Sequence, residues 1–137
     1  MRACIYASSL FKKYVEERGS DALDDLLQDI SEIAVSPVTS IEMHAVVARR
    51  LREKTLTPRQ AGWLTSQAQK DFQNFHRVIW NEDLERTATD FVYRYPLSTL
   101  DAIQLASGVL AKADVFVTSD RALFEQARRE IRKALYL

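Results

Sequence analysis

The chain has 137 residues, of which 47% are hydrophobic and 28% are charged, with only 3 glycines and 3 prolines. This composition excludes an intrinsically disordered chain, and the length predicts one domain, residues 1–137, that buries its own core. Lys plus Arg and Asp plus Glu balance at 19 each, which excludes a uniformly basic surface for nucleic acid. The single Cys4 excludes both a disulfide framework and a multi-cysteine zinc site.

Membrane association is not expected from the sequence. No apolar run approaches the ~18 residues that a membrane span needs. The first apolar stretch, residues 3–6, is too short for the core of a signal peptide. We therefore expect a soluble, cytoplasmic protein with no membrane partner.

Strand-like and helix-like segments alternate along the chain. Short apolar segments predict strands at 3–6, 33–35, 77–80, 115–117 and 134–137. Segments of helical period predict helices at 8–17 (with Ser8 as N-cap), 22–30, 40–53, 58–75, 82–93, 100–113 and 121–130. The fourth of these helices opens with a capping box at Thr57. Strands separated by helices predict an α/β fold, a parallel sheet of about four to five strands between about seven helices.

Three acidic residues fall at predicted helix starts or just after predicted strands: Glu42, Asp101 and Asp120. Taken singly, each has a structural explanation. Glu42 and Asp101 follow a Ser or Thr at the spacing of a capping box, and Asp120 is placed to cap the last helix.

A functional explanation emerges when the three acids are considered together. In a parallel sheet, sites form beyond the carboxyl ends of the strands, where these three helix starts meet. Clustered carboxylates repel one another, and a bound Mg²⁺ or Mn²⁺ ion would relieve that repulsion. Such an ion activates water and stabilises charge in phosphoryl transfer. The sequence therefore favours a metal site formed by Glu42, Asp101 and Asp120.

Other candidate chemistry is weaker. His44 and His76 show no metal-ligand spacing and are interpreted as surface or packing residues. Cys4 lies in an apolar segment and is expected to be an inert core thiol. No glycine-rich phosphate loop and no nucleophile elbow is present.

Four segments in this order resemble the PIN-domain ribonucleases, most closely the VapC-type toxins of bacterial toxin–antitoxin pairs. The segments are the N-terminal strand with residues 8–17, Thr39-Ser40-Ile41-Glu42, Leu100-Asp101-Ala102-Ile103-Gln104-Leu105-Ala106, and Val117-Thr118-Ser119-Asp120. The resemblance covers essentially the whole chain, and its last two segments are the most specific.

The resemblance implies a PIN-like fold and Mg²⁺- or Mn²⁺-dependent cleavage of RNA by a metal-bound water. Glu42, Asp101 and Asp120 match the second, third and fourth acids of the family, and Ser8 and Thr118 match pocket hydroxyls. It also implies a homodimer and a cognate, VapB-like antitoxin that lies across the site.

One position departs from the family pattern. The first strand of the family ends in an Asp, and here the matching residue is Tyr6, with no acid before Glu16. A phenol, whose pKa is ~10, cannot be an anionic ligand near neutral pH. We therefore expect impaired metal binding and cleavage, with the Tyr6 hydroxyl donating a hydrogen bond to Asp101 or Asp120.

Two other functions remain open. The first is a catalytically inactive PIN domain that still binds an antitoxin or RNA, which Tyr6 would also fit. The second is a phosphorelay receiver, but the sequence lacks an acidic pair after the first strand and a phosphoacceptor Asp after a middle strand.

Overall fold

The computed structural model describes residues 1–137 and contains a five-stranded sheet. The strands are β1 (Arg2–Ile5), β2 (Glu32–Val35), β3 (His76–Arg77), β4 (Val115–Thr118) and β5 (Lys133–Tyr136). The helices are α1 (Ala7–Leu10), the 3₁₀ helix η1 (Phe11–Lys13), α2 (Ser20–Gln28), α3 (Thr39–Arg52), α4 (Pro58–Phe72), α5 (Glu82–Arg94), α6 (Thr99–Leu110) and α7 (Arg121–Glu130). None of the helices is long and apolar enough to cross a membrane.

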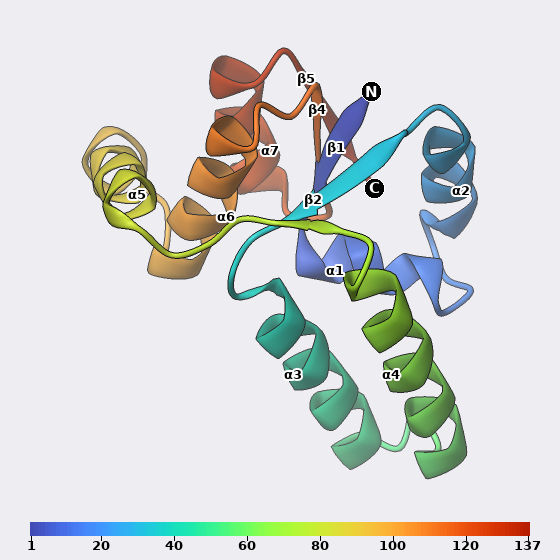
Figure 1. Cartoon of the computed structure of the whole chain (residues 1–137). Helices are drawn as coiled ribbons and strands as arrows, with labels where there is room; N and C mark the ends of the chain where they lie inside the picture. The colour runs from blue at the N-terminus through green and yellow to red at the C-terminus, as the bar shows by residue number, and fades with distance from the viewer.

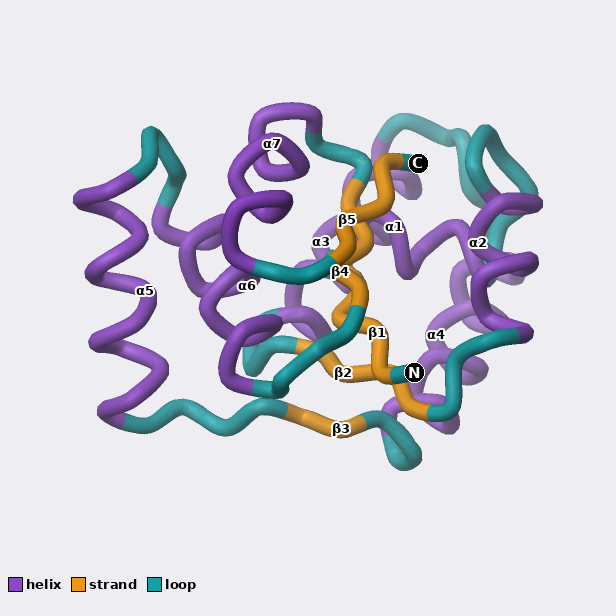
Figure 2. Tube along the Cα trace, turned by 90° about the horizontal axis from the view of Figure 1, so that it is seen from above, coloured by secondary structure: helices purple, strands orange, loops and turns teal.

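The sheet has the strand order β3-β2-β1-β4-β5, and every neighbouring pair is parallel. β1 lies in the middle, with Ala3 opposite both Ile33 of β2 and Val115 of β4. Helices α1, α2 and α4 lie on one side of the sheet and α5, α6 and α7 on the other (Figure 2). The predicted α/β fold with a parallel sheet between helices is confirmed.

The alternation of side chains along β1 creates two hydrophobic cores. Ala3 and Ile5 are fully buried against residues of α1 to α4, whereas Cys4 is fully buried against residues of α5 to α7. Helices α3 and α4 form a hairpin that extends away from the sheet (Figure 1). Because both faces of the sheet are covered, its carboxyl edge is where a site can reach solvent.

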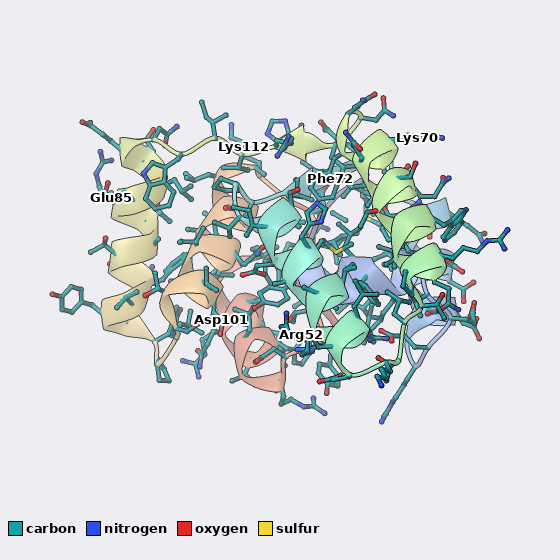
Figure 3. All side chains as sticks on the ribbon, turned by 90° about the horizontal axis from the view of Figure 1, so that it is seen from below. Arg52, Lys70, Phe72, Glu85, Asp101 and Lys112 are labelled. Carbon is teal, nitrogen blue, oxygen red and sulfur yellow. The ribbon has the colours of Figure 1, made fainter.

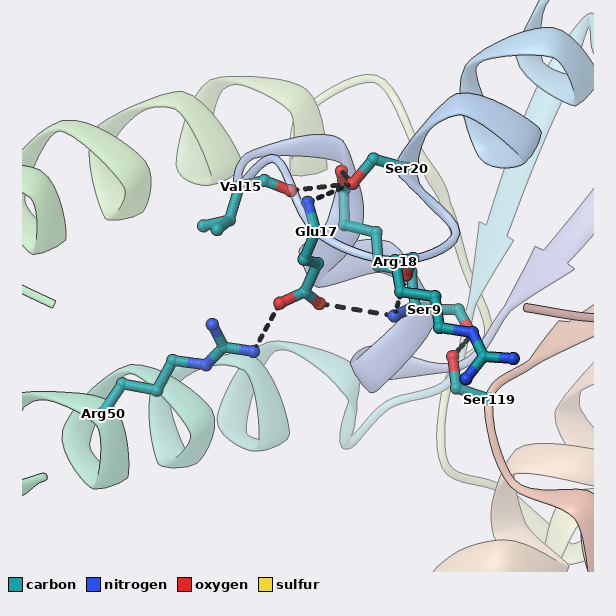
Figure 4. A network of polar contacts seen from close by, with 8 residues as sticks. Ser9, Val15, Glu17, Arg18, Ser20, Arg50 and Ser119 are labelled. Atoms are coloured by element: carbon teal, nitrogen blue, oxygen red, sulfur yellow. Dashed lines mark hydrogen bonds and ion pairs between the residues drawn. The ribbon is translucent and has the colours of Figure 1, made fainter. Parts of the chain in front are cut away.

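The first helix is shorter than predicted, and Ser8 is not its N-cap. α1 begins at Ala7, the N-cap position is Tyr6, and no side chain caps the helix. The helical segment ends at Lys13 instead of residue 17. The Ser20 hydroxyl explains this early end, because it lies 2.9 Å from the carbonyl oxygen of Val15 and accepts a hydrogen bond from the backbone N–H of Glu17 (Figure 4). Backbone groups that a longer helix would pair internally are thus bonded by a side chain from the next helix.

The third strand is also shorter than the predicted 77–80. β3 consists of His76 and Arg77 at the edge of the sheet, and the chain then leaves the sheet. Ile79 and Trp80 are exposed (69% and 54%), so their apolar character does not indicate burial in a strand.

Candidate active site

Tyr6 follows the central strand at the carboxyl edge of the sheet. Its backbone N–H donates to the carbonyl of Val117 at 2.9 Å, which extends the pairing of β1 with β4 by one residue. Its hydroxyl donates to Oδ1 of Asp101 at 2.9 Å. The hydrogen bond expected from the sequence is therefore present, and Asp101 is the acceptor.

Asp101 lies in the first turn of α6, near the start of that helix in Figure 3, with Lys112 beyond its other end. Ser98 is the N-cap, and its hydroxyl oxygen accepts a hydrogen bond from the Asp101 N–H at 3.2 Å. The Asp101 carboxylate accepts from Tyr6. Capping of α6 thus involves the backbone N–H of Asp101 and leaves its carboxylate to bond Tyr6.

Glu42 lies in the first turn of α3, and its carboxylate accepts a hydrogen bond from Nε2 of Gln104 at 3.1 Å. The capping box predicted for Glu42 is wrong, because the N-cap is Val38, which has no side-chain acceptor. The hydroxyl of Thr39 accepts instead from the backbone N–H of Ser36 at 3.0 Å. The second carboxylate oxygen of Glu42, Oε1, is buried and has no hydrogen-bond partner.

Gln104 is a site residue to which the sequence analysis assigned no role. It is fully buried in α6, donates to Glu42 through Nε2, and lies 3.5 Å from the Thr39 hydroxyl through Oε1. A buried amide must find partners, so a glutamine within the apolar segment Ala102–Ala106 was the signal available in the sequence. Gln104 therefore links the first turn of α3 to α6.

Asp120 and Thr118 form the turn between β4 and α7. The Asp120 carboxylate caps α7 by accepting from the Leu123 N–H at 2.9 Å, as expected from the sequence. The Thr118 hydroxyl is fully buried and accepts from the Asp120 N–H at 3.0 Å. Thr118 thus fixes the backbone that carries Asp120.

The two serines of α1 differ in their contacts. The half-buried Ser8, which was the predicted pocket hydroxyl, makes no side-chain hydrogen bond. Ser9 is fully buried, and its hydroxyl lies 2.8 Å from that of Ser119 (Figure 4). The contact that ties α1 to the β4–α7 turn therefore comes from Ser9, a residue that the sequence analysis did not single out.

All three acids act electrostatically on Tyr6. Burial is the main cause that raises the pKa of Tyr6, and the negative charges of Glu42, Asp101 and Asp120 raise it further. The pKa of Glu42 is also raised, mainly by burial, although the Gln104 hydrogen bond acts in the opposite direction. Tyr6 is therefore a phenol that stays neutral at physiological pH under the negative charge of all three carboxylates.

The three acids do not form a metal-binding cluster in this chain. No group of three or more His, Cys, Asp or Glu side chains has the arrangement needed to share an ion. Asp101 accepts from Tyr6, Asp120 from the α7 backbone, and Glu42 from Gln104. The side chains as they stand, with Tyr6 among them, do not fit a divalent ion.

The other titratable candidates lie outside this site. His44 lines a groove between α3 and α4, and His76 lies 3.7 Å from Glu32 at the edge of the sheet. Burial raises the pKa of the Cys4 thiol to about 12, which agrees with an inert core thiol.

Comparison with protein families identifies the fold. Residues 7–130 match the family model of the PIN domain. The chain belongs to the PIN-domain family. PIN domains are generally nucleases that use divalent metal ions. No curated protein sequence matches the chain.

Solved structures share this PIN fold at low sequence identity. A toxin–antitoxin complex from Klebsiella pneumoniae is 17% identical, with a TM-score of 0.65 and 89% of each chain covered. VapBC2 from Rickettsia felis, bound to a DNA fragment from its promoter, is 10% identical, with a TM-score of 0.70 and coverage of 100% of this chain and 99% of the other. FitAcB from Neisseria gonorrhoeae is 12% identical, with a TM-score of 0.70 and coverage of 98% and 96%. The PIN-like fold predicted from the sequence is confirmed.

Proposed function

We propose that this PIN domain is a VapC-type toxin, an Mg²⁺- or Mn²⁺-dependent endoribonuclease whose cleavage is impaired in this chain by Tyr6. The hydrogen bond from the Tyr6 hydroxyl to Asp101 carries the proposal. The family pattern has an acid at position 6, whereas here the uncharged Tyr6 hydroxyl at that position donates to the Asp101 carboxylate. The presence of Glu42, Asp101 and Asp120 at the same edge supports a nuclease site that has lost one acid.

The experiment compares RNA cleavage by the chain and by its Tyr6→Asp variant, with and without Mg²⁺. We expect negligible cleavage by the chain itself and metal-dependent cleavage by Tyr6→Asp. Mg²⁺ should also raise the melting temperature of Tyr6→Asp more than that of the parent, since the added carboxylate increases both repulsion and ion affinity.

Two control variants isolate the charge at position 6. Tyr6→Asn removes the ring without adding a charge and should stay inactive, and Tyr6→Asp with Asp101→Asn should lose the restored activity. Robust metal-dependent cleavage by the unaltered chain, abolished by Asp101→Asn alone, would show that position 6 is not required and would contradict the proposal.

The partner proposed for this toxin is a VapB-like antitoxin. Two of the structurally similar proteins are named as toxin–antitoxin or VapBC complexes. A groove beside α4 is lined by five apolar or aromatic residues, Tyr14, Val15, Leu56, Leu64 and the 57% exposed Trp63, together with polar residues. Such a groove offers apolar contact to an antitoxin segment whatever occupies position 6.

Antitoxin binding is tested by calorimetry with the product of the neighbouring gene. We expect binding by the unaltered chain and a clear loss of affinity in Trp63→Ala. Trp80→Ala is the matched control, because Trp80 is similarly exposed (54%) but lies outside the groove. A folded chain that binds no antitoxin would count against the toxin assignment and leave the PIN fold intact.

The proposal includes a cytoplasmic homodimer, for which light scattering measures the mass.

The second candidate function is a catalytically inactive PIN domain that binds an antitoxin or RNA. The lack of a metal-binding cluster around Tyr6 favours it. If Tyr6→Asp folds and binds antitoxin but shows no cleavage with Mg²⁺ or Mn²⁺, the chain is such a binding module.

A further inference from the structure

A cluster of one arginine and two aromatic rings lies at the start of α7 and the end of β5. The guanidinium carbon of Arg121 lies 4.3 Å from the centroid of the Tyr136 ring and 5.9 Å from that of Phe124. The two rings are 5.9 Å apart and tilted by 53°. These distances fall within the range of cation–π and aromatic pairs, so the rings hold the Arg121 guanidinium beside them.

This cluster adjoins the turn between β4 and α7, which forms part of the candidate active site. Arg121 directly follows Asp120, and Tyr136 is paired in register with Thr118. Thr118 and Asp120 form the turn at the carboxyl edge of β4. A ligand that contacts Arg121 is therefore bound at the turn that carries Asp120, one of the three acids.

The donors of Arg121 are free to bind a ligand. Arg121 is exposed, and its guanidinium forms no ion pair and no hydrogen bond within the chain. Arg128 on the same helix lies over the same Phe124 ring but bonds Glu125 at 3.3 Å. Tyr136 is 39% exposed, and its hydroxyl has no partner in the structure.

We propose that Arg121 and Tyr136 form a nucleotide-binding subsite that positions single-stranded RNA beside the acids at the sheet edge. Its place in a reaction rests on the proposed function. The carboxylates of the site repel a polyanion, so a neighbouring cation with free donors supplies the attraction that the site itself lacks. An exposed guanidinium beside an aromatic ring has the groups to stack on a base and to donate to a phosphate. An acidic protein segment would use the charge but not the stacking, so the aromatic component favours RNA.

The test is fluorescence anisotropy of the unaltered chain with a short, labelled single-stranded RNA of mixed sequence. Arg121→Gln and Tyr136→Leu should each weaken binding about tenfold, since stacking of one base contributes about 5- to 150-fold in affinity. Arg129→Gln is the matched control, because Arg129 is an exposed arginine of the same helix that lies over neither ring, and its replacement should change affinity less than about twofold. Arg121→Lys keeps the charge and should still lose the stacking share of the affinity. Unfolding midpoints in urea show which variants stay folded.

Several outcomes would overturn the inference. It fails if the chain binds no RNA, if Arg121→Gln binds as the parent does, or if Arg129→Gln weakens binding equally. It also fails if Arg121→Gln weakens antitoxin binding but not RNA binding, which would make the surface a protein interface.

The inference and the proposed function can fail separately. RNA cleavage by Tyr6→Asp that is unaffected by Arg121→Gln would reject the subsite and keep the nuclease. RNA binding that depends on Arg121, without any cleavage by Tyr6→Asp, would keep the subsite and reject the nuclease.

Discussion

The buried amide of Gln104 gives the most direct test of how the site is held together. Gln104→Met keeps the length and shape of the side chain but removes the donor to Glu42. A hydrogen bond to a charged group contributes ~1.5–3 kcal/mol, and a carboxylate oxygen that loses its donor stays desolvated. Glu42 is half-buried and the 3.5 Å contact with Thr39 is weak, so the lower part of that range applies. We expect Gln104→Met to lower the free energy of unfolding by about 2 kcal/mol at pH 7.

The assay is urea unfolding of four proteins in a double-mutant cycle: the parent, Gln104→Met, Glu42→Ala and the double variant. The coupling energy should be about 1–2 kcal/mol. Gln69→Met makes the same chemical change on the exposed surface of α4 and should alter stability by less than about 0.5 kcal/mol. If Gln104→Met costs the same with and without Glu42, the glutamine only fills space and the link between α3 and α6 is refuted.

Three other predictions concern packing, capping and pH. Gly108→Ala should destabilise the protein by about 1–3 kcal/mol, because a Cβ there would lie 2.9 Å from a methyl of Ile131. Gly62→Ala should instead stabilise α4 by up to about 1 kcal/mol, because a Cβ at Gly62 would have nothing within 4 Å. Calorimetric melting measures both effects. Thr57→Ala removes one half of the capping box and should cost about 1 kcal/mol in urea unfolding. The pKa of Glu42 is raised in the folded state. The stability that Glu42 contributes is therefore fully present below its ordinary pKa of 4.5 and is lost as pH rises through the higher pKa of the folded state. The stability of Glu42→Gln relative to the parent should therefore increase from pH 4 to pH 7, and a flat difference across that range would contradict the assigned pKa shift.

The sequence predicted those features that depend on neighbouring residues along the chain. The capping box at Thr57 and the cap at Asp120 each involve residues three positions apart, and both are present. The parallel sheet followed from the alternation of strands and helices, which requires crossover connections. The position of Tyr6 at the end of β1 then placed its hydroxyl near the first turn of α6.

The features that the sequence did not predict depend on contacts between distant segments. Local spacing favours a capping box for Glu42, but its actual partner, Gln104, comes from another helix. Likewise, helical periodicity continues past Lys13, but the Ser20 hydroxyl binds the backbone there. Ser8 and Ser9 are equivalent in sequence, and only the packing of α1 against the β4–α7 turn shows that Ser9 is the one that makes the contact.

The central place of β1 in the sheet has a consequence for biosynthesis. β1 is made first, yet its pairing with β4 joins Ala3 to Val115, so this pair cannot form until most of the chain has been translated. At ~5–20 residues per second, the wait is roughly 6 to 20 s. During that interval the apolar segment Ala3–Ile5 lacks one of its two neighbouring strands and is open to pairing with other chains. The nascent protein should therefore depend on chaperones until β4 leaves the ribosome, and slower translation of residues 36–114 should lower its soluble yield.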